Sequence, residues 1–147
     1  MSHTPTFHEL SRAECEALLT SQHVGRMAFA FRNRVDIEPV HFVYRDGWIY
    51  GRTQPGTKLS VLAHHPWVAF EVDEVDALFD WRSVVVHGRV EFPDAERGPR
   101  EQQRLDHTRR ALQSLLPLAF TDADPTPHRD VLFAIAVEDM TGREARS

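Results

Sequence analysis

Two threonines, an arginine and a lysine gather between Arg52 and Lys58, where an apolar run meets a Pro-Gly turn. From Thr57 onward the sequence has the character of a helix. A helix N-terminus presents unpaired backbone N–H groups and the positive end of the helix dipole, and both attract anions. Arg52, Thr53, Thr57 and Lys58 therefore form a candidate anion site, with a phosphate monoester as the first candidate ligand. The alternative is a solvated turn that binds nothing.

Composition sets Lys58 apart from the other basic residues. It is the only lysine in the chain, whereas the other sixteen of the seventeen basic residues are arginines. An ammonium group is a compact charge on a flexible stem, unlike the planar guanidinium fork of arginine. A single lysine at the turn favours the interpretation as an anion site.

The elements that must position this site follow from capping and hydrophobic periodicity. Ser11 and Glu14 have the spacing of a capping box, which predicts a helix with Cys15 on its apolar side. The pattern also predicts helices over residues 57–65 and 101–116, and strands over residues 24–31, 35–44, 48 onward, 67–73, 81–92 and 131–138. Short links between successive strands favour antiparallel pairing. We therefore expect an α+β fold with a six-stranded antiparallel sheet, curled into a barrel, and three helices.

Two stretches of the predicted sheet bear on function. Pro39 lacks an N–H, so this part of its strand is expected at a sheet edge or a bulge, either open to a ligand or second chain or simply an edge proline. In the strand from Trp81, the hydroxyl of Ser83 is a candidate ligand contact or a filler near the strand start. The acidic stretch over residues 71–76 is predicted to run into a loop as a solvated rim.

Composition excludes several function classes. The 147 residues suit one domain, and the net charge of −5 argues against nucleic acid as a partner. No apolar run is long enough for a membrane span, and the start of the chain does not resemble a signal peptide. Cys15, the only cysteine, is expected to be a buried small hydrophobe and fits a reducing cytoplasm.

The residue types of enzyme active sites are present without their usual spacing. The nine histidines include no HExxH pattern, so no metal site is expected. His41 borders the predicted ligand strand, although a lone strand histidine is more often structural. We find no nucleophile elbow, no phosphate-binding glycine loop and no catalytic triad, and hence expect no catalytic side chain. An enzyme built on this sequence would rely on a cofactor.

The chain resembles the pyridoxamine 5′-phosphate oxidase-like family of FMN-binding split β-barrel proteins, in particular its short nitroimidazole-resistance-like branch. The resemblance spans residues 10–143, and the order and spacing of its pieces carry it. These pieces are residues 9–12 with the first helix, and residues 24–28, 39–42, 49–53, 55–59, 81–89 and 135–143.

The resemblance implies a homodimer that holds two FMN molecules in clefts between the subunits. Thr53 and Lys58 would hold the phosphate, with Thr57 and Arg52 beside them. The flavin ring would lie along one strand, and a second strand would complete the cleft. The residues of these two strands are Pro39, Val40, His41 and Phe42, and Trp81, Ser83 and Val84.

The implied activity is that of an oxidoreductase that passes electrons from a reduced nicotinamide donor to a small-molecule acceptor. Two alternatives are a reductase that uses the deazaflavin F420 and a non-enzymatic module that binds flavin or haem. Residues 141–147 lack the Arg/His/Trp substrate motif of true pyridoxamine phosphate oxidases. The resemblance therefore does not imply oxidation of vitamin B6.

Overall fold

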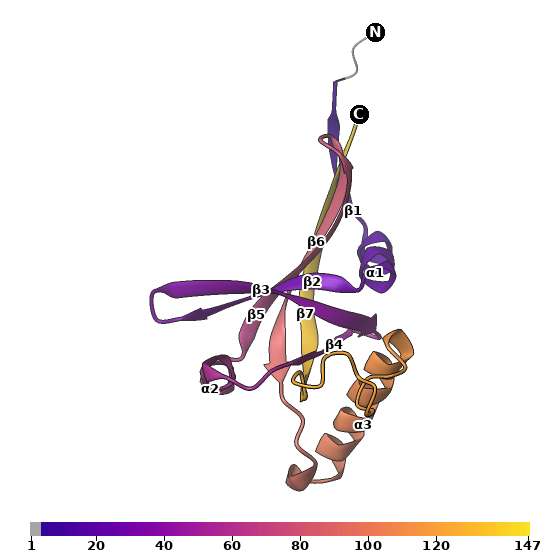
Figure 1. Ribbon diagram of the computed structural model, residues 1–147. Helices are drawn as coiled ribbons and strands as arrows, with labels where there is room; N and C mark the ends of the chain where they lie inside the picture. The colour runs from indigo at the N-terminus through magenta and orange to yellow at the C-terminus, as the bar shows by residue number, and fades with distance from the viewer. Residues whose placement is uncertain (1–3) are drawn as a thin grey trace.

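Six antiparallel strands close on themselves to form the body of the molecule, as seen in a computed structural model that describes residues 4–147 (Figure 1). Neighbouring strands follow the order β7, β4, β3, β2, β5, β6, and the pairing of β6 with β7 closes the ring. The expected six-stranded split β-barrel is therefore confirmed. The strands are β2 (Val24–Phe31), β3 (Arg34–Arg45), β4 (Trp48–Thr53), β5 (Trp67–Ala77), β6 (Asp80–Glu91) and β7 (Val131–Arg146).

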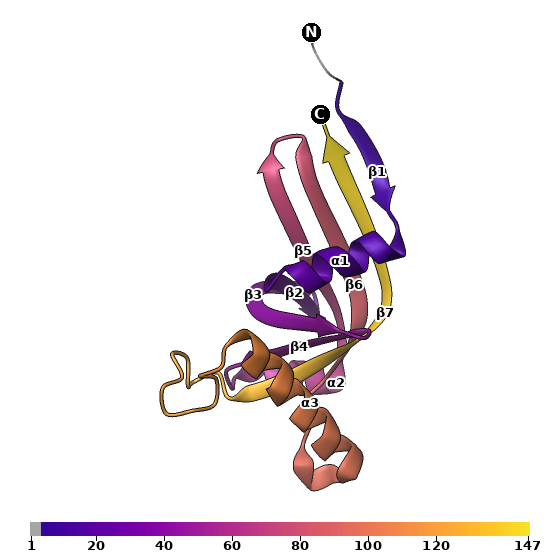
Figure 2. The same ribbon diagram turned by 90° about the vertical axis from the view of Figure 1, so that its right-hand side faces the viewer.

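A seventh strand, β1 (Thr6–Leu10), was not expected from the sequence. It pairs antiparallel with the end of β7, so that Thr6 lies opposite Arg146 and Leu10 opposite Gly142. Figure 2 shows β1 beside β7, with both ends of the chain at the same end of the sheet. Of its five residues only Leu10 is buried. A strand this exposed has no alternating apolar pattern by which it could be recognised.

Three α-helices flank the barrel, as expected. Helix α1 (Arg12–Ser21) begins at the predicted capping box, in which the hydroxyl of Ser11 accepts a hydrogen bond from the Glu14 N–H at 3.1 Å. In return the Ser11 N–H donates to the Glu14 carboxylate at 2.9 Å. Cys15 is buried as predicted, and this burial raises the pKa of its thiol.

The other two helices lie near the candidate site. Helix α2 (Thr57–His64) follows β4 after a short turn, and helix α3 (Pro99–Leu115) follows β6 after the 3₁₀ turn η1 (Ala95–Arg97). Helix α3 packs on the outer face of β3, β4 and β7, where a small apolar cluster forms. The cluster contains Val43, Tyr50, Ala111 and Ala134. Of the helices formed by residues 4–147, none is both long and apolar enough to cross a membrane.

The barrel interior holds the main apolar core. Phe42 and Phe70 are fully buried there and meet edge to face, with ring centroids 4.9 Å apart. This geometry is favoured by the ring quadrupoles and adds to the stabilisation from burial. Successive side chains of each strand point alternately into this core and away from it, and this alternation sets the direction of each candidate side chain.

The acidic stretch over residues 71–76 corrects one expectation, because it is part of β5 and not a loop. Cross-strand ion pairs compensate its charge: Arg26 lies 3.2 Å from Glu71 and 3.4 Å from Asp73, and Arg82 lies 3.7 Å from Glu74. Strand β7 is also longer than predicted, since its last third pairs with both β1 and β6. Tertiary pairing extends both strands beyond their local patterns.

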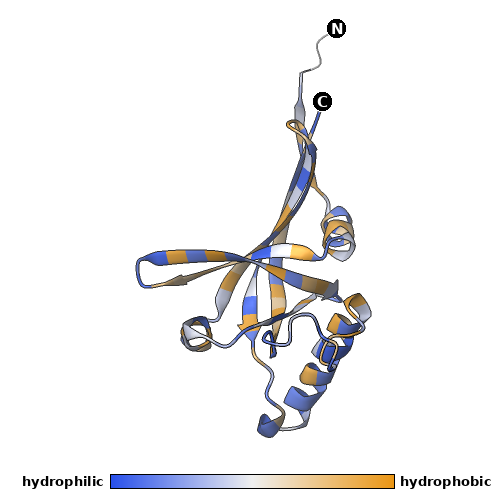
Figure 3. Ribbon diagram, viewed as in Figure 1, coloured by the Kyte–Doolittle hydropathy of each residue, from blue (hydrophilic) through white to orange (hydrophobic). Residues whose placement is uncertain are grey.

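The β2–β3 hairpin projects from the barrel as a two-stranded arm (Figure 1). Hydrophobic residues alternate with hydrophilic ones along the arm (Figure 3). Three of its apolar residues are exposed: Phe31, Val35 and Ile37, at 40%, 74% and 67%. A two-stranded ribbon with apolar residues in water is not stable by itself. Val35 and Ile37 lie on the same face of the arm, and within residues 4–147 both remain largely exposed.

Candidate anion site at the start of helix α2

Lys58 lies where β3, β4 and α2 meet. Its ammonium group donates a hydrogen bond to the hydroxyl of Thr53 at 2.7 Å and forms an ion pair with Glu38. The Lys58 side chain is only 15% exposed. The structure therefore brings Thr53 and Lys58 together, as predicted, and places the carboxylate of Glu38 beside them.

The N-terminus of α2 contributes backbone donors at the same place. Its N-cap is Gly56, which has no side chain, and no side chain caps the helix. The first N–H groups of a helix lack the usual partner one turn earlier. The Leu59 N–H already donates to the Gly56 carbonyl at 3.1 Å, which leaves the N–H groups of Thr57 and Lys58 as candidate donors to a ligand. Thr57, the first residue of the helix, is exposed and adds a hydroxyl.

Strand β3 presents an unpaired edge beside this site. Pro39 pairs with Arg26 of β2 on one side, whereas the pairing of β3 with β4 begins only at Phe42. The expectation of an edge position for Pro39 is confirmed. Among residues 4–147, no strand pairs with the other side of residues 38–41.

Side chains along β3 alternate between two faces. Val40 and Phe42 are buried in the main core, so they can meet a ligand only through their backbone groups. His41 is exposed on the opposite face and lies among residues of α3 and of the loop that follows it. The side chain of His41 is thus directed away from Lys58.

Arg52 also points away from Lys58, because it alternates with Thr53 on β4. Its guanidinium binds the carboxylate of Asp124 through two hydrogen bonds of 2.7 and 2.8 Å and donates to the Thr126 carbonyl at 2.8 Å. These hydrogen bonds hold the pKa of Asp124 well below its usual range. In this structure Arg52 organises the loop before β7 and is not joined to the Lys58 site.

Trp81, Ser83 and Val84 lie toward the other end of the sheet. The ring of Trp81 is 6.4 Å from that of Phe7, Ser83 donates to Glu71 at 2.9 Å, and Val84 is buried in the core. Burial is the main cause that raises the pKa of Glu71. The end of β6 near α2 is marked by Arg89, which pairs with Trp67, a residue that closely follows α2. Trp81 lies eight positions from Arg89 along β6, a separation of roughly 26 Å. One chain does not bring these residues to Lys58.

Two residues of this region, Glu38 and Asp124, could not be predicted from the sequence. Glu38 had no recognisable signal, because a carboxylate is the opposite of what an anion site requires. Asp124 belongs to a loop rich in Asp and Pro, which predicts a turn without indicating a buried partner. Only the fold shows that Arg52 and Asp124 meet.

Fold and site together define a split β-barrel protein in which a lysine, a hydroxyl and a helix start lie beside an open strand edge. A family model for pyridoxamine 5′-phosphate oxidase matches residues 11–144. The chain belongs to the pyridoxamine 5′-phosphate oxidase family.

Two solved structures are similar over almost the whole chain. A FAD-binding protein of Mesorhizobium loti is 31% identical, with 96% of this chain and 99% of that chain covered and a TM-score of 0.75. The FAD-binding protein of Mycobacterium smegmatis is 27% identical, with coverage of 94% and 98% and a TM-score of 0.68. An uncharacterised protein of Rhizobium meliloti is 24% identical over 145 residues, which cover 92% of this chain and 93% of the relative.

Proposed function

We propose that this protein binds FMN, with the phosphate at the N-terminus of α2. The observation that carries the proposal is the convergence of the only lysine with a hydroxyl and an uncapped helix start. A phosphate there would accept charge-assisted hydrogen bonds from Lys58, from the hydroxyls of Thr53 and Thr57 and from backbone N–H groups. The donor set therefore fits a phosphate monoester.

Glu38 is the one group at the site that opposes this ligand. In the structure its carboxylate neutralises Lys58 in the manner of an internal anion. A phosphate must take over the ammonium group, so binding would move Glu38 away from Lys58. The carboxylate is 32% exposed and can turn toward solvent.

The flavin ring would lie against the open edge of β3, along Pro39, Val40, His41 and Phe42. Backbone N–H and C=O groups on this edge can satisfy the polar side of the ring. Bound flavin would supply the capacity to accept and donate a hydride or single electrons. This chain would bind and orient it, and no side chain need act as acid or base.

A homodimer would complete the cleft. Trp81, Ser83 and Val84 lie away from Lys58 within one chain, which supports a cleft in which a second subunit provides them. The exposed apolar arm adjoins the site, since Glu38 follows Ile37 on β3. An arm that packs on a second copy would set the flavin at the subunit boundary and shield it from water.

The overall reaction we propose is electron transfer from a reduced nicotinamide donor to a small-molecule acceptor. FAD is the second candidate cofactor, because both similar solved structures are FAD-binding proteins and FAD contains the FMN half. Acid release of the cofactor from purified protein, followed by mass measurement, distinguishes FMN from FAD. Release of F420 or haem, or of none of these, would contradict the FMN assignment.

Replacing Lys58 tests the phosphate site. We expect Lys58→Ala to weaken FMN binding by about 1.5–3 kcal/mol, the contribution of a hydrogen bond to a charged group. Titration of apoprotein by flavin fluorescence quenching measures this change. Arg110→Ala is the control, because Arg110 is exposed on α3 and bonds only within its own helix. Equal affinity of the Lys58→Ala variant and wild type would refute the phosphate assignment.

A further inference from the structure

A cavity lies on the opposite side of β4 from Lys58, between α3 and the loop over residues 116–130. Its volume is about 370 Å³, within the usual range for small-molecule sites. Apolar side chains form most of its wall: Leu112, Leu115, Leu116, Ala119 and Pro125. This volume is near the lower end of that range, so the cavity suits a small ligand with an apolar body.

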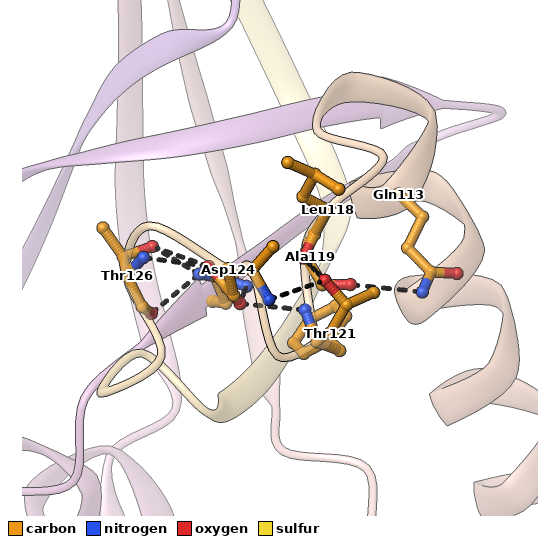
Figure 4. Close-up of polar contacts among 9 residues, drawn as sticks. Gln113, Leu118, Ala119, Thr121, Asp124 and Thr126 are labelled. Atoms are coloured by element: carbon orange, nitrogen blue, oxygen red, sulfur yellow. Dashed lines mark hydrogen bonds and ion pairs between the residues drawn. The ribbon is translucent and has the colours of Figure 1, made fainter.

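The loop that covers the cavity is fixed by buried polar contacts (Figure 4). Asp124 accepts hydrogen bonds from Arg52 and from the backbone N–H groups of Phe120 and Thr126, at 2.7 to 2.9 Å. Gln113 of α3 donates to the carbonyl of Ala119 at 3.3 Å. A loop of this length without regular structure is uncommon unless it has a function. The cavity wall is therefore preorganised.

Phe120 adds evidence that this loop is held in an unfavourable conformation. Its φ of 67° lies in the left-handed region, which is unusual for a bulky residue. The Arg52 guanidinium lies 4.9 Å from the centre of the Phe120 ring. The backbone N–H of Phe120 donates a hydrogen bond to the Asp124 carboxylate. Such conformations persist where surrounding contacts over-determine them, and they concentrate at ligand sites.

The charge of the cavity is positive. Arg52 is neutralised by Asp124, but Arg129, which is half-buried in the wall, forms no ion pair within residues 4–147. The only other titratable group in the wall is His41, and none of the lining residues is acidic. A planar guanidinium binds a carboxylate through two parallel hydrogen bonds. One unpaired guanidinium matches a single negative charge.

We infer that this cavity binds a small monocarboxylate with an aromatic or branched aliphatic body, its carboxylate at Arg129 and its body against α3. The inference goes beyond the proposed flavin function and rests only on contacts within this chain. His41 connects the two sites, because it lines the cavity and lies on the strand proposed to border the flavin. The ligand of this cavity would thus lie across β3 from the flavin.

Calorimetric titration with benzoate, benzamide and benzylamine tests the inference on the full-length protein. These probes share a ring of suitable size and differ in charge. We expect benzoate to bind at least tenfold more tightly than benzamide, and benzylamine to bind more weakly still. Comparable affinity for benzoate and benzamide, or no binding of benzoate, would overturn the inference.

Two variants assign the site. We expect Arg129→Gln to weaken benzoate binding about tenfold or more, and Leu115→Trp to abolish it by filling the cavity. Arg110→Gln on the exposed side of α3 is the matched charge control and should bind as wild type does. Lys58→Ala should also retain benzoate binding, because Lys58 lies outside the cavity. The benzoate result therefore tests the cavity independently of the flavin proposal. Unchanged affinity in Arg129→Gln would reject the assignment even if Leu115→Trp does not fold.

Discussion

Glu38 distinguishes the candidate phosphate site, because it places a carboxylate beside the ammonium group of Lys58. In the structure its carboxylate binds the same ammonium group that is proposed to bind phosphate. The two anions would therefore compete for Lys58. A carboxylate that remains near a bound phosphate would also repel it, by an amount that falls as salt increases.

Removal of this carboxylate should strengthen flavin binding. We expect Glu38→Gln to bind FMN about three- to tenfold more tightly at low salt, with a smaller difference at high salt. Fluorescence titration at two ionic strengths measures both effects. Glu91→Gln, an exposed change at the C-terminal end of β6, should leave affinity unchanged. Weaker binding by Glu38→Gln would show that Glu38 helps to hold the ligand.

At the scale of elements, the loop over residues 116–130 depends on one buried ion pair. The side chains of Arg52 and Asp124 are 7% and 3% exposed. Breaking a buried pair by removing one partner leaves an uncompensated charge and is strongly destabilising. The pair therefore joins β4 to a loop that would otherwise have little to hold it.

We expect Asp124→Asn to lower the Tm at neutral pH by roughly 5–10 °C. Because folding depresses the pKa of Asp124, its stabilisation is complete above the ordinary Asp pKa of about 4 and is lost as the pH falls below it. The difference in Tm between wild type and variant should thus shrink between about pH 5 and pH 2. Thermal unfolding across this range measures it, with Asp122→Asn, an exposed change in the same loop, as control. A difference that is independent of pH would contradict the role of the charge.

At the scale of the whole molecule, a closed barrel leaves its apolar β2–β3 arm in solvent. The arm and the separation of Trp81 from Lys58 both point to a second subunit. Sedimentation of the protein should give a mass about twice the 16.9 kDa of one chain. A monomer with a bound flavin would contradict the proposed intersubunit cleft.

A charge on the arm tests whether assembly and cofactor binding are linked. We expect Ile37→Glu to yield a folded monomer with flavin affinity reduced at least tenfold, because Ile37 is 67% exposed and supports no core within its own chain. Sedimentation and flavin titration on the same sample measure the two effects. Leu118→Glu, a matched change at a 50% exposed position away from the arm, should remain dimeric. A dimeric Ile37→Glu variant would place the interface elsewhere.

The sequence by itself determined the local elements and the first candidate residues. The capping box at Ser11, the β2 strand and the edge position of Pro39 follow from interactions between near neighbours, which leave a local pattern. The gathering of Thr53, Thr57 and Lys58 was visible for the same reason, since a strand, a turn and a helix start lie within six residues.

Only the tertiary structure decided which side chains share a face and what they meet. Strand alternation sends Arg52 and His41 away from Lys58, and closure of the barrel brings Asp124 to Arg52 across 72 residues. Ion pairs with cross-strand arginines compensate the charge of the acidic stretch within β5. Pairing with β7 forms the exposed strand β1. Such partners are distant in the chain and leave no local periodicity, so their consequences appear only when the sheet closes.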